Sequence, residues 1–130
     1  MQNRYTQEIE VRAEHLDDLA HVNNVQYLSW VQDIAKEHWN TLASHFHFEG
    51  IWVVREHRIT YKKQAVLGDR ISIQTFIKNA RGPLSERIVH FTHATTDELF
   101  VECSTQWCLL DPQSFRPMRV PEEVSLKLGL

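Results

Sequence analysis

The amino-acid sequence predicts an α+β fold, in which one long helix is wrapped by a five-stranded antiparallel sheet. Two patterns indicate this fold. One stretch of about 20–24 residues places apolar side chains at steps of three and four, and the segments on either side of it alternate apolar with polar side chains. The chain has 130 residues, of which 42% are hydrophobic and 24% charged, as is typical of a folded domain. We therefore expect a single domain over residues 1–130.

Five segments are predicted as strands because apolar and polar side chains alternate along them. They cover residues 5–13, 53–61, 69–77, 86–95 and 99–109. Each therefore has one buried face and one more polar face, as in an antiparallel sheet that is covered on one side. The open edges of such a sheet carry unpaired backbone groups, so we expect edge-to-edge pairing between subunits.

The long helix is expected over residues 25–46, between the first and second strands. No glycine or proline interrupts this stretch until Gly50. A short amide side chain accepts well from the first free N–H groups of a helix, so Asn23 or Asn24 is the expected N-cap. The apolar stripe consists of Val25, Leu28, Val31, Ile34, Ala35, Trp39, Leu42, Ala43 and Phe46.

Charge and hydropathy exclude several classes of protein. The chain has 14 basic and 17 acidic residues and a formal net charge of −3, whereas a general nucleic-acid binder normally carries a basic excess. Its longest apolar runs, 51–54 and 107–110, are far shorter than the roughly 20 residues of a membrane-spanning helix. The N-terminus lacks the apolar segment of a signal peptide. We therefore expect a cytoplasmic protein without nucleic-acid or membrane partners.

Polar side chains crowd the turn between the first strand and the helix. Within residues 15–24, two acids, two histidines and two asparagines precede the start of the helix. The free N–H groups and the positive dipole end of a helix suit a developing oxyanion, and a nearby carboxylate could act as a base or a nucleophile. Acids in front of a helix are also ordinary capping groups, so the pattern alone leaves both interpretations open.

The same turn resembles a known signature. Residues 17–27 resemble the Asp-x-x-x-His-Val-Asn-Asn-x-x-Tyr motif of hotdog-fold thioesterases, in the superfamily of 4-hydroxybenzoyl-CoA thioesterase and acyl-carrier-protein (ACP) thioesterase. Ile59-Thr60-Tyr61 and Leu67-Gly68-Asp69 resemble that family's strand and following turn. The resemblance extends over about residues 5–122 and implies the hotdog fold. It also implies an acyl-CoA thioesterase, which hydrolyses an acyl-CoA to the free acid and CoA.

The resemblance implies roles for individual residues of the turn. Asp17 would act as general base or nucleophile, and the backbone N–H near Asn24 would polarise the thioester carbonyl. Asn23 would cap the helix or orient a water, and His21 would be a hydrogen-bonding or acid–base partner. Tyr27 is expected to pack beneath the turn or to touch the substrate.

Contacts to the phosphates of CoA are expected at a predicted hairpin. Glycine lets the backbone approach a ligand and arginine matches phosphate geometry, so Arg81, Gly82 and Arg87 are the first candidates. An ordinary hairpin turn with solvated arginines is the alternative, and Lys62 and Lys63 are the second candidates. No set of four metal ligands is evident, so we expect no metal and no cofactor besides the CoA of the substrate.

The chain departs from the pattern of plant acyl-ACP thioesterases at two positions. Leu19 stands where they have an Asn, and the stretch 61–64 ends on Gln64 without their second acid. These departures leave Asp17 to act more alone, while Asp33 or Glu37 could instead supply an acid from the helix. The resemblance further implies a homodimer or a tetramer of dimers, with the site at a dimer interface. An acyl-ACP thioesterase and a non-catalytic acyl-CoA-binding module remain alternatives, and a hotdog dehydratase is a more distant one.

Overall fold

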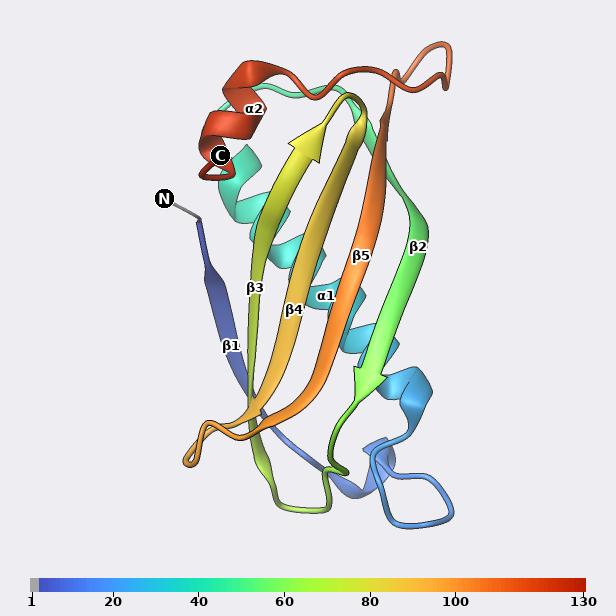
Figure 1. Ribbon diagram of the computed structural model, residues 1–130, viewed down its shortest axis with the longest axis vertical. Helices are drawn as coiled ribbons and strands as arrows, with labels where there is room; N and C mark the ends of the chain where they lie inside the picture. The colour runs from blue at the N-terminus through green and yellow to red at the C-terminus, as the bar shows by residue number, and fades with distance from the viewer. Residues whose placement is uncertain (1–2) are drawn as a thin grey trace.

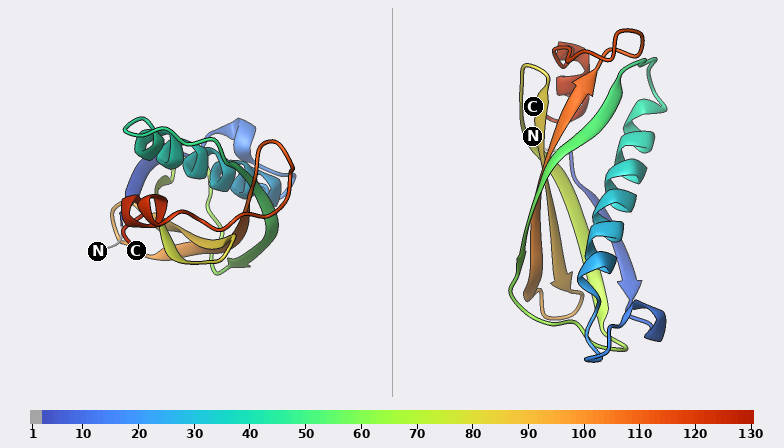
Figure 2. Two further views of the ribbon diagram at one scale, coloured as in Figure 1. Left: turned by 90° about the horizontal axis from the view of Figure 1, so that it is seen from above. Right: turned by 90° about the vertical axis from the view of Figure 1, so that its right-hand side faces the viewer.

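The computed structural model describes residues 3–130, and it has the predicted architecture (Figure 1). Its five strands form one antiparallel sheet in the order β1-β3-β4-β5-β2. Figure 2 shows α1 lying across one face of the curved sheet. The elements are β1 (Tyr5–Glu10), a 3₁₀ turn (Ala13–His15), α1 (Asn24–Ala43), β2 (Ile51–Tyr61), β3 (Arg70–Arg81), β4 (Leu84–His93), β5 (Leu99–Leu110) and α2 (Glu122–Lys127). The α+β prediction of one long helix wrapped by five antiparallel strands is confirmed.

Helix α1 buries one stripe of side chains against the sheet, but Val25, which was predicted to belong to this stripe, is 70% exposed in the first turn of the helix. The helix ends at Ala43, before the predicted end at Phe46. Phe46 and Phe48 instead pack their rings against Trp39, so the chain leaves the helix to bury two further aromatic side chains. The buried stripe consists of Tyr27, Trp30, Val31, Ile34, Ala35, His38 and Leu42.

The other elements also differ from the prediction, and β3 for example extends to Arg81 rather than to residue 77. Strand β1 ends at Glu10 rather than at residue 13, because the N–H and C=O of Val11 bond to Asp69 and Gly68 in the β2–β3 loop. Helix α2 was not predicted. Its Val124 is buried and packs with other apolar side chains at one end of the sheet. None of the helices in the described part of the chain is long and apolar enough to cross a bilayer.

The core between α1 and the sheet consists of two apolar clusters with a layer of polar side chains between them. One cluster includes Ile73, Cys103 and Ile34, and the other includes Ile77 and Leu109. The polar layer takes one residue from each of four strands and one from the helix, and we call it the polar belt. It consists of Thr75 (β3), Arg87 (β4), Thr105 (β5), His57 (β2) and His38 (α1).

Candidate active site

The turn between β1 and α1 is closed by backbone hydrogen bonds. Leu16 pairs with Val22 as an isolated antiparallel bridge, and the Asp17 N–H donates to the His21 carbonyl over 2.8 Å. Ala20 has a φ of 61°, a left-handed conformation that lets the chain reverse within these few residues. Because Leu16 pairs with Val22, the reversal places the backbone of Asp17 close to the start of α1, whose N-cap is Asn23.

The carboxylate of Asp17 is held inside this turn by backbone donors. Its Oδ1 accepts from the N–H of Leu19 over 2.9 Å and from the N–H of His21 over 3.2 Å. Within residues 3–130, Oδ2 has no hydrogen-bond partner. The side chain is half-buried. One oxygen therefore fixes the orientation of the carboxylate, and the other remains available to a reactant.

The start of α1 leaves one amide without a partner. Asn23 is the N-cap, and its Oδ1 accepts from the Val25 N–H over 2.8 Å, as predicted for this residue. The Gln26 N–H donates to the Asn23 carbonyl over 2.9 Å. In the part of the chain that the structure describes, the N–H of Asn24 has no acceptor. This amide is the first of the helix, where the dipole favours negative charge, and it is the predicted oxyanion donor.

Two predicted residues lie around this carboxylate and amide. His21 is half-buried, its backbone closes the turn, and its ring makes no hydrogen bond to the described residues. Tyr27 is buried and packs its ring against Trp30, Tyr61 and Phe91. Burial raises the pKa of the Tyr27 phenol to about 12. Tyr27 therefore supports the turn from the core and stays protonated at neutral pH.

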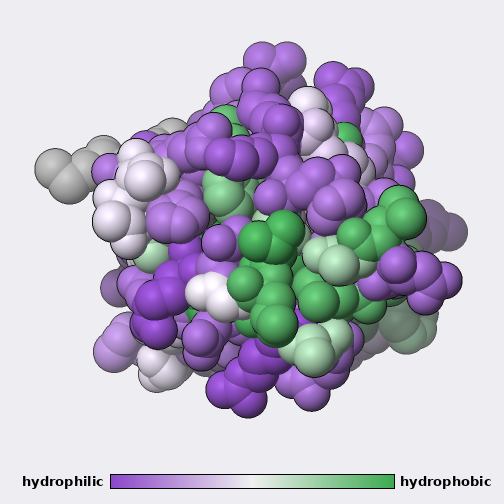
Figure 3. Space-filling model, turned by 90° about the horizontal axis from the view of Figure 1, so that it is seen from below, coloured by the Kyte–Doolittle hydropathy of each residue, from purple (hydrophilic) through white to green (hydrophobic). Residues whose placement is uncertain are grey.

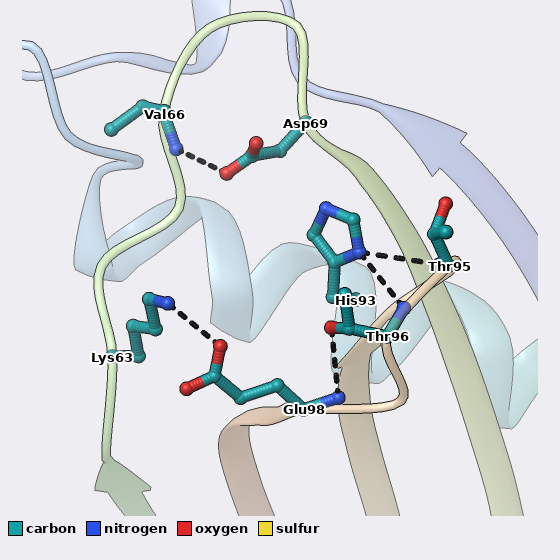
Figure 4. Close-up of polar contacts among 7 residues, drawn as sticks. All are labelled: Lys63, Val66, Asp69, His93, Thr95, Thr96 and Glu98. Carbon is teal, nitrogen blue, oxygen red and sulfur yellow. Dashed lines mark hydrogen bonds and ion pairs between the residues drawn. The ribbon is translucent and has the colours of Figure 1, made fainter.

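The β2–β3 loop and the β4–β5 turn lie at the same end of the molecule as the site turn (Figure 1), and Figure 4 shows their polar contacts. The Val66 N–H donates to the Asp69 carboxylate over 3.0 Å, and Lys63 forms a 2.7 Å ion pair with Glu98. The β4–β5 turn is closed by His93, whose Nδ1 accepts from two backbone N–H groups. Both loops thus have a defined conformation set by their own polar side chains.

Apolar side chains gather on the surface at this end of the molecule (Figure 3). The site turn and the β2–β3 loop are joined by a 3.0 Å hydrogen bond from the Val22 N–H to the Ala65 carbonyl. The exposed apolar residues here, which we call the apolar patch, are Leu19, Val25, Val66 and Leu67. Exposed apolar patches commonly mark surfaces that bind a ligand or a partner.

Arg81 and Gly82 form the β3–β4 hairpin turn, at the opposite end of the molecule from Asp17 (Figure 1). Gly82 has a φ of 57°, a conformation that favours glycine. The turn lines a cavity of about 280 Å³ together with Arg119 and Ser125, which sequence reasoning missed. Within one chain, the predicted phosphate contacts and the candidate catalytic residues are therefore far apart.

The prediction that Arg87 extends this phosphate-binding turn is wrong. Its side chain is only 4% exposed and donates to His38 and Thr75 inside the polar belt. Arg87 lies on the helix-facing side of β4, so the alternation of the strand turns it into the core. Of the second candidates, Lys62 is exposed and Lys63 is paired with Glu98. Within residues 3–130, no cluster of three or more His, Cys, Asp and Glu side chains could hold a metal ion.

The fold and the family match define the class of protein. A long helix against a curved five-stranded antiparallel sheet is the hotdog fold of solved thioesterase structures. The family model described as acyl-ACP thioesterase N-terminal domain matches residues 2–128, and the chain belongs to this family. No protein in the curated collection of sequences matches the chain.

Solved structures of thioesterases share the fold. A probable thioesterase from Escherichia coli, YbaW, is 22% identical, with a TM-score of 0.82 over 95% of this chain and 95% of that one. Slr0204 from Synechocystis, a 1,4-dihydroxy-2-naphthoyl-CoA thioesterase, is 14% identical, with a TM-score of 0.83 over 98% and 96%. The 12:0-ACP thioesterase from Umbellularia californica is 15% identical, with a TM-score of 0.82 over 97% of this chain and 52% of that one.

Proposed function

We propose that this chain is an acyl-CoA thioesterase, which hydrolyses an acyl-CoA to the free acid and CoA. One observation carries the proposal: the Asp17 carboxylate has a free oxygen in the same turn that ends at the unpartnered N–H of Asn24. A carboxylate and a helix N-terminal amide are the two groups that attack on a thioester carbonyl requires. Membership of the thioesterase family supports this interpretation of the turn.

The reaction follows from these two groups. The carbonyl oxygen of the thioester accepts from the Asn24 N–H, and the positive end of the α1 dipole stabilises the charge that develops on that oxygen. Asp17 takes a proton from water as the water attacks the carbonyl carbon. The tetrahedral intermediate then expels CoA as thiolate, which takes up that proton, and the acid is released. We assign to His21 a hydrogen bond to the intermediate or to the leaving group.

A second route uses the same atoms in a different order. Asp17 Oδ2 attacks the carbonyl carbon directly, CoA thiolate leaves, and an acyl-aspartyl anhydride forms. Water then hydrolyses the anhydride and regenerates the carboxylate. Incorporation of ¹⁸O into the protein during a single turnover in ¹⁸O-labelled water would identify this second route. Only direct attack followed by hydrolysis at the aspartyl carbon leaves ¹⁸O in the protein.

We propose CoA rather than ACP as the carrier of the acyl group. The Synechocystis protein, which is named for a CoA thioester, matches this chain over 96% of its length, whereas the plant ACP enzyme matches over 52%. The acyl group would lie on the apolar patch of Leu19, Val25, Val66 and Leu67. Hydrolysis of an acyl-ACP is the alternative that the name of the matched family favours.

We propose that the functional unit is a homodimer, or a tetramer built from such dimers, with β2 as the edge that pairs. Strand β2 has 11 residues, and Ile51 and Val53 on it are each 36% exposed. The other edge, β1, has 6 residues and is linked to α1 by hydrogen bonds from Tyr5 and Gln7 to Glu37. An open edge strand that exposes apolar side chains, as β2 does at Ile51 and Val53, can pair with a second chain.

Antiparallel pairing of two β2 strands would place the hairpin end of one chain beside the Asp17 end of the other. Arg81 and Arg119 of one subunit would then hold the CoA phosphates of a substrate that reacts at the partner's site. We expect Arg81→Ala and Arg119→Ala to raise KM for acyl-CoA roughly tenfold each with kcat little changed. An unchanged KM in both variants would contradict this assignment of the phosphate contacts.

The experiment that tests the function is a measurement of thiol release from a panel of acyl-CoAs and matched acyl-ACPs. We expect turnover, and higher kcat/KM on an acyl-CoA than on the acyl-ACP with the same acyl group. Faster turnover on acyl-ACP would favour the alternative carrier. Binding of acyl-CoA without release of thiol would contradict hydrolysis and indicate a non-catalytic binding module.

A further inference from the structure

A second cavity lies between α1 and the sheet, away from the site turn. Its volume is about 520 Å³, within the range of small-molecule binding sites. The α1 residues that line it begin at Gln32, eight residues beyond Asn24, which corresponds to about 12 Å along the helix axis. Its apolar walls are formed by Trp39, Trp52, Trp107, Val54, Ile77 and Leu128.

The cavity has a buried cation in its wall. Arg87 lines it, is only 4% exposed, and donates through one guanidinium nitrogen to His38 Nδ1 over 2.9 Å and to Thr75 Oγ1 over 3.0 Å. Burial lowers the pKa of Arg87 to about 10, so the guanidinium is still charged at neutral pH. Within residues 3–130, no carboxylate pairs with Arg87.

The partners of Arg87 do not compensate its charge. Burial and the positive charge of Arg87 lower the pKa of His38 to about 4, so His38 is neutral at pH 7. His38 accepts from Arg87 through Nδ1, and its Nε2 lies 3.2 Å from the amide oxygen of Asn3, as a donor in this tautomer. Thr75 already donates its hydroxyl to the carbonyl of Ile88. A buried cation without an anionic partner is costly in free energy, so an anion bound in the cavity would compensate the charge of Arg87.

Two tryptophans and a serine also line this cavity. The indole Nε1 atoms of Trp52 and Trp107 are buried and have no hydrogen-bond partner in the described residues. Both rings line the cavity, as does Ser85, which is 4% exposed. No acidic side chain lines it, and Lys36 adds a second positive charge. Aromatic walls, several donors and no acidic acceptor are a suitable environment for an aromatic or apolar carboxylate.

We propose that this cavity binds a small organic acid, with its carboxylate on Arg87 and its apolar or aromatic body against Trp39, Trp52 and Trp107. This site is distinct from the turn at Asp17. Two sources of the carboxylate share this chemistry. It is either a free acid or the far end of an acyl group that carries its own carboxyl, and the experiment below distinguishes them.

Calorimetric titration with 2-naphthoate and with its neutral analogue 2-naphthamide tests the proposal. We expect 2-naphthoate to bind once per chain, and 2-naphthamide to bind roughly tenfold to a hundredfold more weakly, since it cannot form a charged hydrogen bond with Arg87. Equal affinity for the two compounds, or no binding of 2-naphthoate at millimolar concentration, would overturn the proposal.

Three variants locate the binding. Arg87→Met should weaken 2-naphthoate binding to the level of the amide, while Arg116→Met, at an exposed arginine outside the cavity, should leave it unchanged. Val54→Phe keeps Arg87 but fills part of the cavity, and it should also abolish binding. This variant keeps the test decisive if Arg87→Met does not fold. Wild-type affinity in Val54→Phe would place the ligand elsewhere and refute the site.

Inhibition kinetics distinguish the two sources, and only this part rests on the proposed thioesterase activity. Competition between 2-naphthoate and acyl-CoA that Val54→Phe abolishes would indicate that the cavity holds the far end of the acyl group. Bound 2-naphthoate without competition would indicate a separate site for a free acid. Because calorimetry needs no turnover, a protein without thioesterase activity could still bind the acid, and an active enzyme could fail to bind it.

Discussion

The role that we propose for Asn24 belongs to its backbone N–H, so the identity of the side chain at this position does not indicate the chemistry. The Asn23 side chain accepts from the N–H of Val25 and its carbonyl accepts from Gln26, so the second and third amides of α1 have acceptors and the first does not. That amide is unpartnered in the described chain because it comes first in the helix. The Asp17 carboxylate is fixed by two backbone N–H groups in the turn that leads into this helix. In the proposed mechanism it is the second reacting group.

Asn24→Pro tests the amide alone. Proline is favoured at the first position of a helix, and the preceding Asn23 has φ −63° and ψ 136°, which a residue before proline readily adopts. We expect the variant to fold and to lose about 10²–10³ in kcat for thioester hydrolysis, the usual cost of one oxyanion donor. Asn24→Ala keeps the N–H and should retain activity. Comparable rates for both variants would remove the amide from the mechanism.

At the scale of elements, the sequence predicts the helix, the strands and their buried faces, because these follow from the periodicity of apolar side chains. The stripe of α1 and the alternation of the strands identify the buried faces, and Asn23 is the predicted cap. The end of α1 is misplaced because Phe46 and Phe48 pack against a cluster that includes Ile77 and Leu109, which lie far along the chain. Helix α2 had a usable signal: Pro121, then two acids in the first turn, and Lys127 in the last.

The hydrogen-bond partners within the polar belt could not be predicted from the sequence. The alternation of β4 places Arg87 on the buried face, but nothing local shows which groups will satisfy it. Its partners come from β3, 12 residues earlier, and from α1, 49 residues earlier. The same reason explains the wrong assignment of Arg87 to the hairpin: a single strand pattern gives the face of a residue but not its neighbours.

The polar belt predicts a dependence of stability on pH. Folding lowers the pKa of His38 from 6.5 to about 4, so between these values the unfolded chain binds a proton that the folded chain does not. The free energy of unfolding therefore falls as the pH falls through this window, by about 2 kcal/mol between pH 7 and pH 5 from this residue. Burial lowers the pKa of His57 as well and acts in the same direction.

His38→Gln isolates this effect, since glutamine can accept from Arg87 and donate to Asn3 but does not titrate. Urea denaturation at pH 7 and pH 5 measures the difference. We expect the wild type to lose about 2 kcal/mol more than His38→Gln between the two pH values. An equal loss in both proteins would show that His38 is not held neutral by the fold.

At the scale of the whole molecule, the two ends of the chain carry different parts of the proposed site. The turn with Asp17 and the apolar patch lies at one end, and the hairpin with Arg81 and Arg119 lies at the other (Figure 1). One chain alone cannot bring them together. A dimer through β2 would, because antiparallel edge strands run in opposite directions.

Size-exclusion chromatography with light scattering tests this arrangement. We expect a mass of twice the 15.3 kDa chain, or of four times that mass if dimers pair further. Val53→Lys places a charge on the β2 edge and should shift the equilibrium towards single chains, whereas Leu126→Lys, at an exposed position of α2, should not. A wild type that stays at 15.3 kDa at micromolar concentration would contradict the dimer.

The most direct measurement of the central claim compares Asp17→Asn with Asp18→Asn in the thioester assay. Asparagine at position 17 keeps an Oδ1 that can accept from Leu19 and His21, so the turn should persist, but it cannot take a proton as the carboxylate does. The account predicts that kcat falls at least about hundredfold in Asp17→Asn and stays near wild type in Asp18→Asn. Full turnover by Asp17→Asn would contradict it.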